Sequence, residues 1–138
     1  MDFDTFKSKF AETMMFYQIM ENDIKLIYAF MRGGDPNENY EEIENKTLGQ
    51  MINTLRDFDY SQKEPLISKD SYNFMSQICD NRNHWAHKVF ISFLYVDDWP
   101  NSKEYEKQCK KLEKDHDRLE RAYRLLEKFR LDYCRFEG

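Results

Sequence analysis

The chain has 138 residues, the length of one domain, and its 41% hydrophobic and 16% aromatic content excludes a disordered protein. Four glycines and three prolines exclude collagen-like and turn-rich β architectures and favour long helices. The net charge of −5 argues against a nucleic-acid binder that relies on bulk attraction to phosphates, so any RNA contact needs a local site or a groove assembled from two chains. We therefore expect a single domain over residues 1–138.

The first predicted element is a helix of about thirty residues, because apolar side chains recur at steps of three and four from Phe3 to Met31. The Gly-Gly-Asp-Pro segment of residues 33–36 is predicted to end it. An acidic connector follows, with one helical turn near Tyr40–Glu44. Thr47 and Gln50 have the spacing of a capping box and predict a second, shorter helix.

Residues 59–67 are predicted to form a loop, after which Ser68 caps a third helix that continues through Val89 and into the run up to Tyr95. Residues 97–102 break the chain again. The last helix is predicted from apolar positions seven apart, and it reaches Phe136. No convincing strand alternation occurs. The sequence therefore predicts an all-α protein, an up-and-down bundle of four main helices.

The cysteines and the N-terminus indicate where we expect the protein to reside. Cys79, Cys109 and Cys134 are odd in number and form no C-x-x-C pair, as in a protein with reduced, packed thiols. The first residues are acidic where a signal peptide is basic, and no apolar run approaches the length of a membrane span. We expect a cytoplasmic protein that does not contact membranes.

The residues that can carry chemistry gather in one segment, from Ile78 to Phe90. Asn83 and His87 are four apart and share one helix face, and the long side chain of Arg82 can swing into the same patch. Arginine binds phosphate oxygens, imidazole transfers a proton near neutral pH, and an amide orients either group. The set suits a phosphodiester and needs neither metal nor cofactor, although a capping or interhelical hydrogen-bond network would also explain it.

The segment Arg82-Asn83-x-x-Ala86-His87, late in the third helix of a small all-α bundle, resembles the HEPN superfamily. The signature of that superfamily is Arg, often followed by Asn, His or Asp, and a His after four to six further residues. Thr47-Leu48-Gly49-Gln50 at the start of a short second helix also looks like the small prokaryotic members. The resemblance covers most of the chain as architecture, and its specific part is residues 82–87.

The resemblance implies a homodimer in which two such motifs face each other across a cleft. Catalytic members are metal-independent endoribonucleases of toxin–antitoxin, abortive-infection and other antiviral systems. By position, Arg82 would stabilise charge on phosphorus, His87 would be the general acid and base for attack by the ribose 2′-hydroxyl, and Asn83 would position them. His84 and Lys88 are weaker candidates for binding the RNA substrate.

The sequence departs from one subfamily of the HEPN proteins. Members modified by a partner nucleotidyltransferase carry a tyrosine two residues after the histidine, where this chain has Val89. Adenylylation at that position is therefore in doubt, and the partner protein, an antitoxin or a nucleotidyltransferase, is not readable. The alternative is a non-catalytic helical module that binds a partner protein or a nucleotide. A plain helical scaffold would leave the Arg–His cluster unexplained.

Three further polar residues lie outside the motif. His116 falls in a mixed-charge segment, which predicts a solvated helix face. Glu21 and Asp23 flank the apolar stripe of the first helix, where charges at the helix surface are the default. Either carboxylate could instead reach the site across the bundle.

Overall fold

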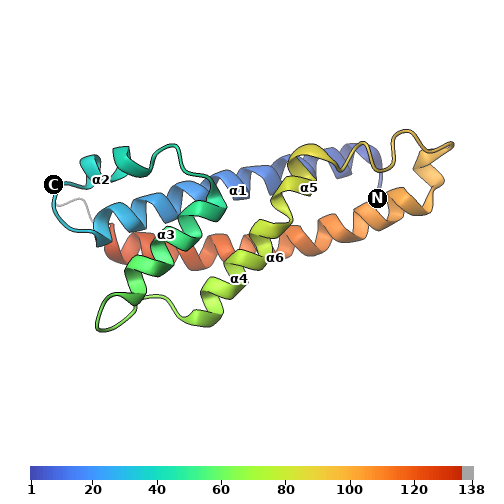
Figure 1. Ribbon diagram of the computed structural model, residues 1–138. Helices are drawn as coiled ribbons and strands as arrows, with labels where there is room; N and C mark the ends of the chain where they lie inside the picture. Colours follow the sequence, from blue (N-terminus) through green and yellow to red (C-terminus); the bar gives the residue numbers. More distant parts are fainter. Residues whose placement is uncertain (135–138) are drawn as a thin grey trace.

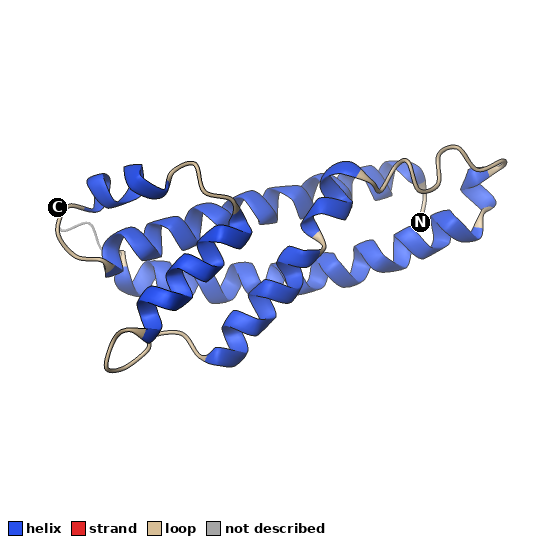
Figure 2. Cartoon of the chain, viewed as in Figure 1, coloured by secondary structure: helices blue, strands red, loops and turns tan. Residues whose placement is uncertain are grey.

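The computed structural model describes residues 1–134, and over that range the protein is all-helical (Figures 1 and 2). The predicted all-α class is confirmed: six α-helices and one short 3₁₀ helix follow one another, and the described residues contain no strand. Phe136, which the sequence assigned to the last helix, lies outside the described residues. No helix in this range is apolar over enough of its length to cross a bilayer.

Two long helices form the frame, α1 (Phe3–Met31) and α6 (Lys103–Tyr133), and they lie side by side in the same direction (Figure 1). Polar contacts follow in matching order along the pair: Met1, just before α1, with Tyr105, then Glu12 with His116, and Asp23 with Arg130. Four helices in up-and-down order would make the first and last antiparallel. The pair is parallel because the chain reverses its direction one additional time, through the short helix α2.

The chain reverses after α1 at Gly33 and Gly34, whose φ angles of 76° and 77° lie in the left-handed region that glycine adopts without strain. Asp35 then caps α2 (Pro36–Ile43), because its side chain accepts a 2.9 Å hydrogen bond from the Asn37 N–H. This helix is longer than the single turn expected from the sequence.

Helices α3 (Leu48–Tyr60) and α4 (Lys69–Asp80) form a hairpin that leans across the α1–α6 pair (Figure 1). The predicted capping box is present: the Thr47 side chain accepts from the Gln50 N–H, and the Gln50 side chain accepts from the Thr47 N–H. Ser68 caps α4 as predicted, accepting from the Ser71 N–H. Both starts are where the sequence places them, because capping depends on neighbouring residues.

The loop between these two helices is organised by one buried carboxylate. Asp59 is fully buried and accepts hydrogen bonds from the N–H groups of Leu66 (2.7 Å) and Ile67 (3.0 Å). The hydroxyl of Tyr72 donates a third bond to it at 2.7 Å. Hydrogen bonds to a charged group are among the stronger ones, so this carboxylate fixes the start of α4 relative to the end of α3.

The third predicted helix is interrupted, which corrects the sequence expectation. It ends at Asp80, and a separate short helix, α5 (Arg82–His87), follows Asn81. The hydroxyl of Tyr17 in α1 donates to the Ile78 carbonyl at 2.9 Å, and the Asn81 N–H approaches the same carbonyl at 3.2 Å. These donors occupy the carbonyl that would otherwise continue the helix.

The run Val89–Tyr95 also differs from the expectation, because it forms turns and does not extend the helix. These turns lead to a 3₁₀ helix, Trp99–Asn101, and bring aromatic side chains onto the N-terminal ends of α1 and α6. The members of this aromatic cluster are Phe3, Phe6, Phe10, Phe90, Phe93, Trp99 and Tyr105. The cluster anchors the segment after α5 to the frame.

Candidate functional site

Helix α5 carries the predicted site residues, and a buried tryptophan holds it in place. Trp85 is fully buried, and its indole N–H donates a 2.7 Å hydrogen bond to Asp115 of α6. Beside it, His84 Nε2 lies 2.7 Å from the side-chain oxygen of Gln108, also in α6. One face of α5 is therefore attached to α6, and His84, predicted to bind substrate, contacts the protein itself.

The opposite face of α5 is open to solvent. Asn83 and His87 are four residues apart, and both side chains are exposed, as is Lys88 directly after the helix. Within residues 1–134, no hydrogen bond or ion pair joins the side chains of Asn83, His87 or Lys88 to another residue. The predicted shared face of Asn83 and His87 is thus present, and its polar groups are available to a ligand.

Arg82 lies on a different side of the same helix. With about 100° per residue, five residues separate Arg82 from His87 by roughly 140° around the axis. The Arg82 side chain is half-buried, and no hydrogen bond or ion pair is formed by it in the described range. A single chain therefore brings Asn83 and His87 together, while the Arg82 side chain starts from a different side of α5.

Arg82 lies within electrostatic range of Cys79 and Tyr17. Burial raises the pKa of the Cys79 thiol, nearby carboxylates of Asp80 and Glu21 raise it further, and the charge of Arg82 acts in the opposite direction. Burial also raises the pKa of the Tyr17 phenol, again partly offset by Arg82. The raised pKa keeps Cys79 mainly as a thiol near neutral pH, which makes it a weak nucleophile. All three cysteines are free thiols.

The two acidic candidates of α1 point to different parts of the molecule. Glu21 lies within electrostatic range of Cys79, next to the start of α5, and forms a 3.8 Å ion pair with Lys25. Asp23 instead faces α6, where one oxygen lies 3.2 Å from Arg130. Of the two, only Glu21 is near the predicted site.

The expectation that His116 lies on a solvated face is wrong. The residue is 9% exposed, and its Nε2 lies 2.7 Å from Glu12 of α1. The sequence contained a signal for this position, because His116 falls between Leu112 and Leu119, which both face the core.

The four best-defined surface hollows of the described residues are not lined by the motif side chains Arg82, Asn83 or His87. A hollow of about 180 Å³ lies next to α5, between α3 and α4, and includes Cys79 and Asp80. No family model, no curated protein and no solved structure matches the chain.

Proposed function

We propose that the protein is a metal-independent endoribonuclease whose site is built on α5, as the resemblance of residues 82–87 to the HEPN superfamily implies. The observation that carries this proposal is the open face of Asn83 and His87, next to a guanidinium that has no acidic partner within residues 1–134. An arginine held by a carboxylate would be less available to a phosphate, whereas an unpaired one can bind phosphate oxygens. The cellular setting implied is a toxin–antitoxin or antiviral defence system.

In this mechanism His87 takes the proton of the ribose 2′-hydroxyl and returns a proton to the leaving 5′-oxygen. Arg82 stabilises the negative charge that develops on the phosphorane oxygens. Asn83, one turn before His87, orients the imidazole or the phosphate. The products are a 2′,3′-cyclic phosphate and a 5′-hydroxyl. The nucleophile is the 2′-hydroxyl of the substrate, so the reaction draws on nothing beyond these side chains.

The separation of Arg82 and His87 around α5 favours a site shared by two chains. In a two-fold dimer, Arg82 of one chain faces His87 of the other, and each motif completes its counterpart. Apolar side chains that follow α5 are exposed and available for such an interface: Ile91 is 67% exposed, Leu94 40% and Tyr95 87%. We propose that these residues contact the same residues of a second chain in a homodimer, and that this contact places the two α5 helices beside each other.

The activity is tested by incubating the purified chain with total RNA in EDTA and comparing variants at the site. His87→Ala is expected to lose about 10²–10⁴-fold in rate with its fold retained, because the exposed imidazole contributes little packing. Arg82→Ala should fall comparably, and Arg82→Lys should recover only part, since an ammonium lacks the planar fork of guanidinium. Lys69→Ala, an exposed cation at the start of α4, is the matched control and should cleave normally. Cleavage that requires Mg²⁺, or equal rates for His87→Ala and wild type, would refute the mechanism.

The dimer is tested separately by light scattering on the Ile91→Asp variant. We expect the wild type to be a dimer at tens of micromolar and the variant to be a monomer without RNA cleavage, since a buried aspartate opposes association. A wild type that is monomeric and still cleaves RNA would refute the shared site.

A second candidate function is a non-catalytic module that binds a partner protein or a nucleotide through the same surface. The observation that favours it is the roughly 140° between Arg82 and His87, which a single chain does not bridge. The binding function replaces the ribonuclease function if two results are obtained together. No RNA is cut under any condition, and a partner protein binds the wild type but does not bind a variant in which the exposed α5 side chains are replaced.

A further inference from the structure

A histidine inside the protein is held between the two frame helices, away from the exposed face of α5. His116 of α6 is 9% exposed, and its Nε2 lies 2.7 Å from Glu12 Oε1 on α1. The ring of Phe16 packs against the imidazole at 5.5 Å between centroids. In the tautomer with one ring hydrogen, that hydrogen is on Nε2, because an ionised glutamate only accepts hydrogen bonds. The lone pair of the ring is then on Nδ1.

Nδ1 of His116 is buried and has no hydrogen-bond partner in the described residues. The atom paired with it at the closest range is Oδ1 of Asp117, at 3.8 Å, which is beyond hydrogen-bond distance. A buried polar atom without a partner is costly, and nitrogen lone pairs of this kind are satisfied in proteins by a donor or a metal ion. The carboxylates of Asp117 and Glu120 lie close to this atom on α6, and carboxylates are acceptors.

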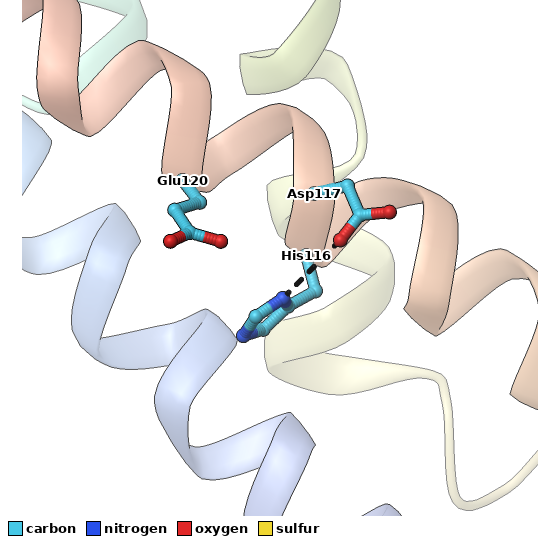
Figure 3. A group of neighbouring side chains, drawn as sticks. All are labelled: His116, Asp117 and Glu120. Carbon is cyan, nitrogen blue, oxygen red and sulfur yellow. Dashed lines mark ion pairs between the residues drawn. The ribbon is translucent and has the colours of Figure 1, made fainter.

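Figure 3 shows these three side chains of α6, with the Nδ1 side of the imidazole toward Asp117 and Glu120 and the other ring nitrogen toward α1. One ligand atom from each of His116, Asp117 and Glu120 lies within 4.8 Å of the others. His116 and Glu120 are one helical turn apart and share a face. Asp117 is exposed and lines a surface hollow together with Glu120, Arg121 and Arg124. Arg124 pairs with Glu120 at 2.9 Å, so an ion bound here takes the place of this guanidinium on the Glu120 carboxylate.

We propose that His116, Asp117 and Glu120 bind a divalent transition-metal ion of the Zn²⁺ class. One imidazole nitrogen with two carboxylate oxygens suits such an ion, whereas Mg²⁺ and Ca²⁺ prefer oxygen alone. Ligand atoms about 2.1 Å from a tetrahedral Zn²⁺ are about 3.4 Å apart, so the side chains need to close by at most about 1.4 Å. Water occupies the remaining position on the side of the hollow.

Glu12 completes the arrangement from the opposite helix. Histidines that bind metals commonly donate their second N–H to a carboxylate, which fixes the ring and raises its basicity. Here the donor is Nε2 and the acceptor is Glu12, so an ion on α6 strengthens the contact between α6 and α1. The residue before His116 is Asp115, which holds Trp85 of α5. The ion thus stabilises the frame on which α5 is mounted, whether or not α5 cleaves RNA.

The test is a titration of the EDTA-stripped full-length chain with Zn²⁺, followed by calorimetry and thermal unfolding. We expect one ion per chain and a melting temperature that rises with Zn²⁺ concentration, as binding to the folded state requires. Asp117→Asn with Glu120→Gln should weaken binding at least 100-fold while leaving the metal-free melting temperature near that of wild type, because Asp117 is exposed and Glu120 is half-buried. Glu12→Gln should weaken it by about 10–100-fold, the effect typical of an outer carboxylate.

His87→Ala is the matched control, since it removes an exposed histidine and should bind Zn²⁺ as wild type does. Co²⁺ provides an independent readout, because nitrogen and oxygen ligands give visible bands without the intense charge-transfer band of a thiolate. Binding that survives the Asp117→Asn, Glu120→Gln double change, a thiolate band from a cysteine, or no 1:1 binding would overturn the proposal. RNA cleavage in EDTA tests a different claim, so either result can fail without the other.

Discussion

Replacing Trp85 with phenylalanine tests how α5 is attached to the frame. The change removes the indole N–H that donates to Asp115 at 2.7 Å and leaves that largely buried carboxylate without its partner. Hydrogen bonds to charged groups contribute about 1.5–3 kcal/mol, and the lost ring atoms add about 1 kcal/mol of packing. We expect Trp85→Phe to lower the free energy of unfolding by about 3 kcal/mol. For a domain of this size that lowers the melting temperature by roughly 10 °C.

The assay is urea unfolding followed by circular dichroism, because tryptophan fluorescence changes with the substitution itself. Trp99→Phe is the matched control: Trp99 is half-buried, and its indole forms no hydrogen bond in the described residues, so the loss should be about 1 kcal/mol. Asp115→Asn keeps an acceptor for Trp85 and removes a buried charge, so it should cost less than Trp85→Phe. Equal losses for the two tryptophan variants would refute the stated contribution of the Trp85–Asp115 bond.

Two further predictions concern buried carboxylates. Asp59→Asn should lower the free energy of unfolding by about 2–3 kcal/mol in urea, since one backbone N–H then faces an amide N–H. Tyr72→Phe should lower it by less, because it removes one hydrogen bond and leaves the carboxylate in place. A larger loss for Tyr72→Phe than for Asp59→Asn would contradict this expectation. Burial raises the folded-state pKa of Asp23 above the ordinary 3.8, and the charge of Arg130 opposes this shift. The stability contributed by protonated Asp23 is therefore complete below pH 3.8 and is lost as the pH rises through the raised pKa. Asp23→Asn should therefore melt higher than wild type at pH 7 and lose this advantage near pH 3; the reverse pH dependence would contradict the sign.

The helix starts were predictable from the sequence because their determinants are local. Thr47 and Gln50 cap α3 and Ser68 caps α4 through bonds that span three residues. The break before α5 was not predictable, because the Tyr17 hydroxyl that occupies the Ile78 carbonyl comes from a residue 61 positions away. The parallel order of α1 and α6 depends on α2, whose acidic sequence reads as a connector.

The candidate site was predictable to a similar extent. The spacing of Asn83 and His87 placed them on one face, and the structure exposes both. The half-buried position of Arg82 depends on the break at Asn81, so residue spacing alone did not reveal it. His116 was misplaced because the charges around it suggested solvent, whereas the contact with Glu12 depends on the parallel packing of α1 and α6.

The attack by the ribose 2′-hydroxyl that we propose at α5 is tested most directly with one modified substrate. An RNA that wild-type protein cuts at a mapped position is prepared with a single 2′-deoxy nucleotide on the 5′ side of that bond. We predict that the unmodified RNA is cut in EDTA to a 2′,3′-cyclic phosphate and a 5′-hydroxyl, and that the deoxy substrate stays intact at that bond. Cutting of the deoxy substrate, or products with a 5′-phosphate, would contradict the mechanism assigned to His87 and Arg82.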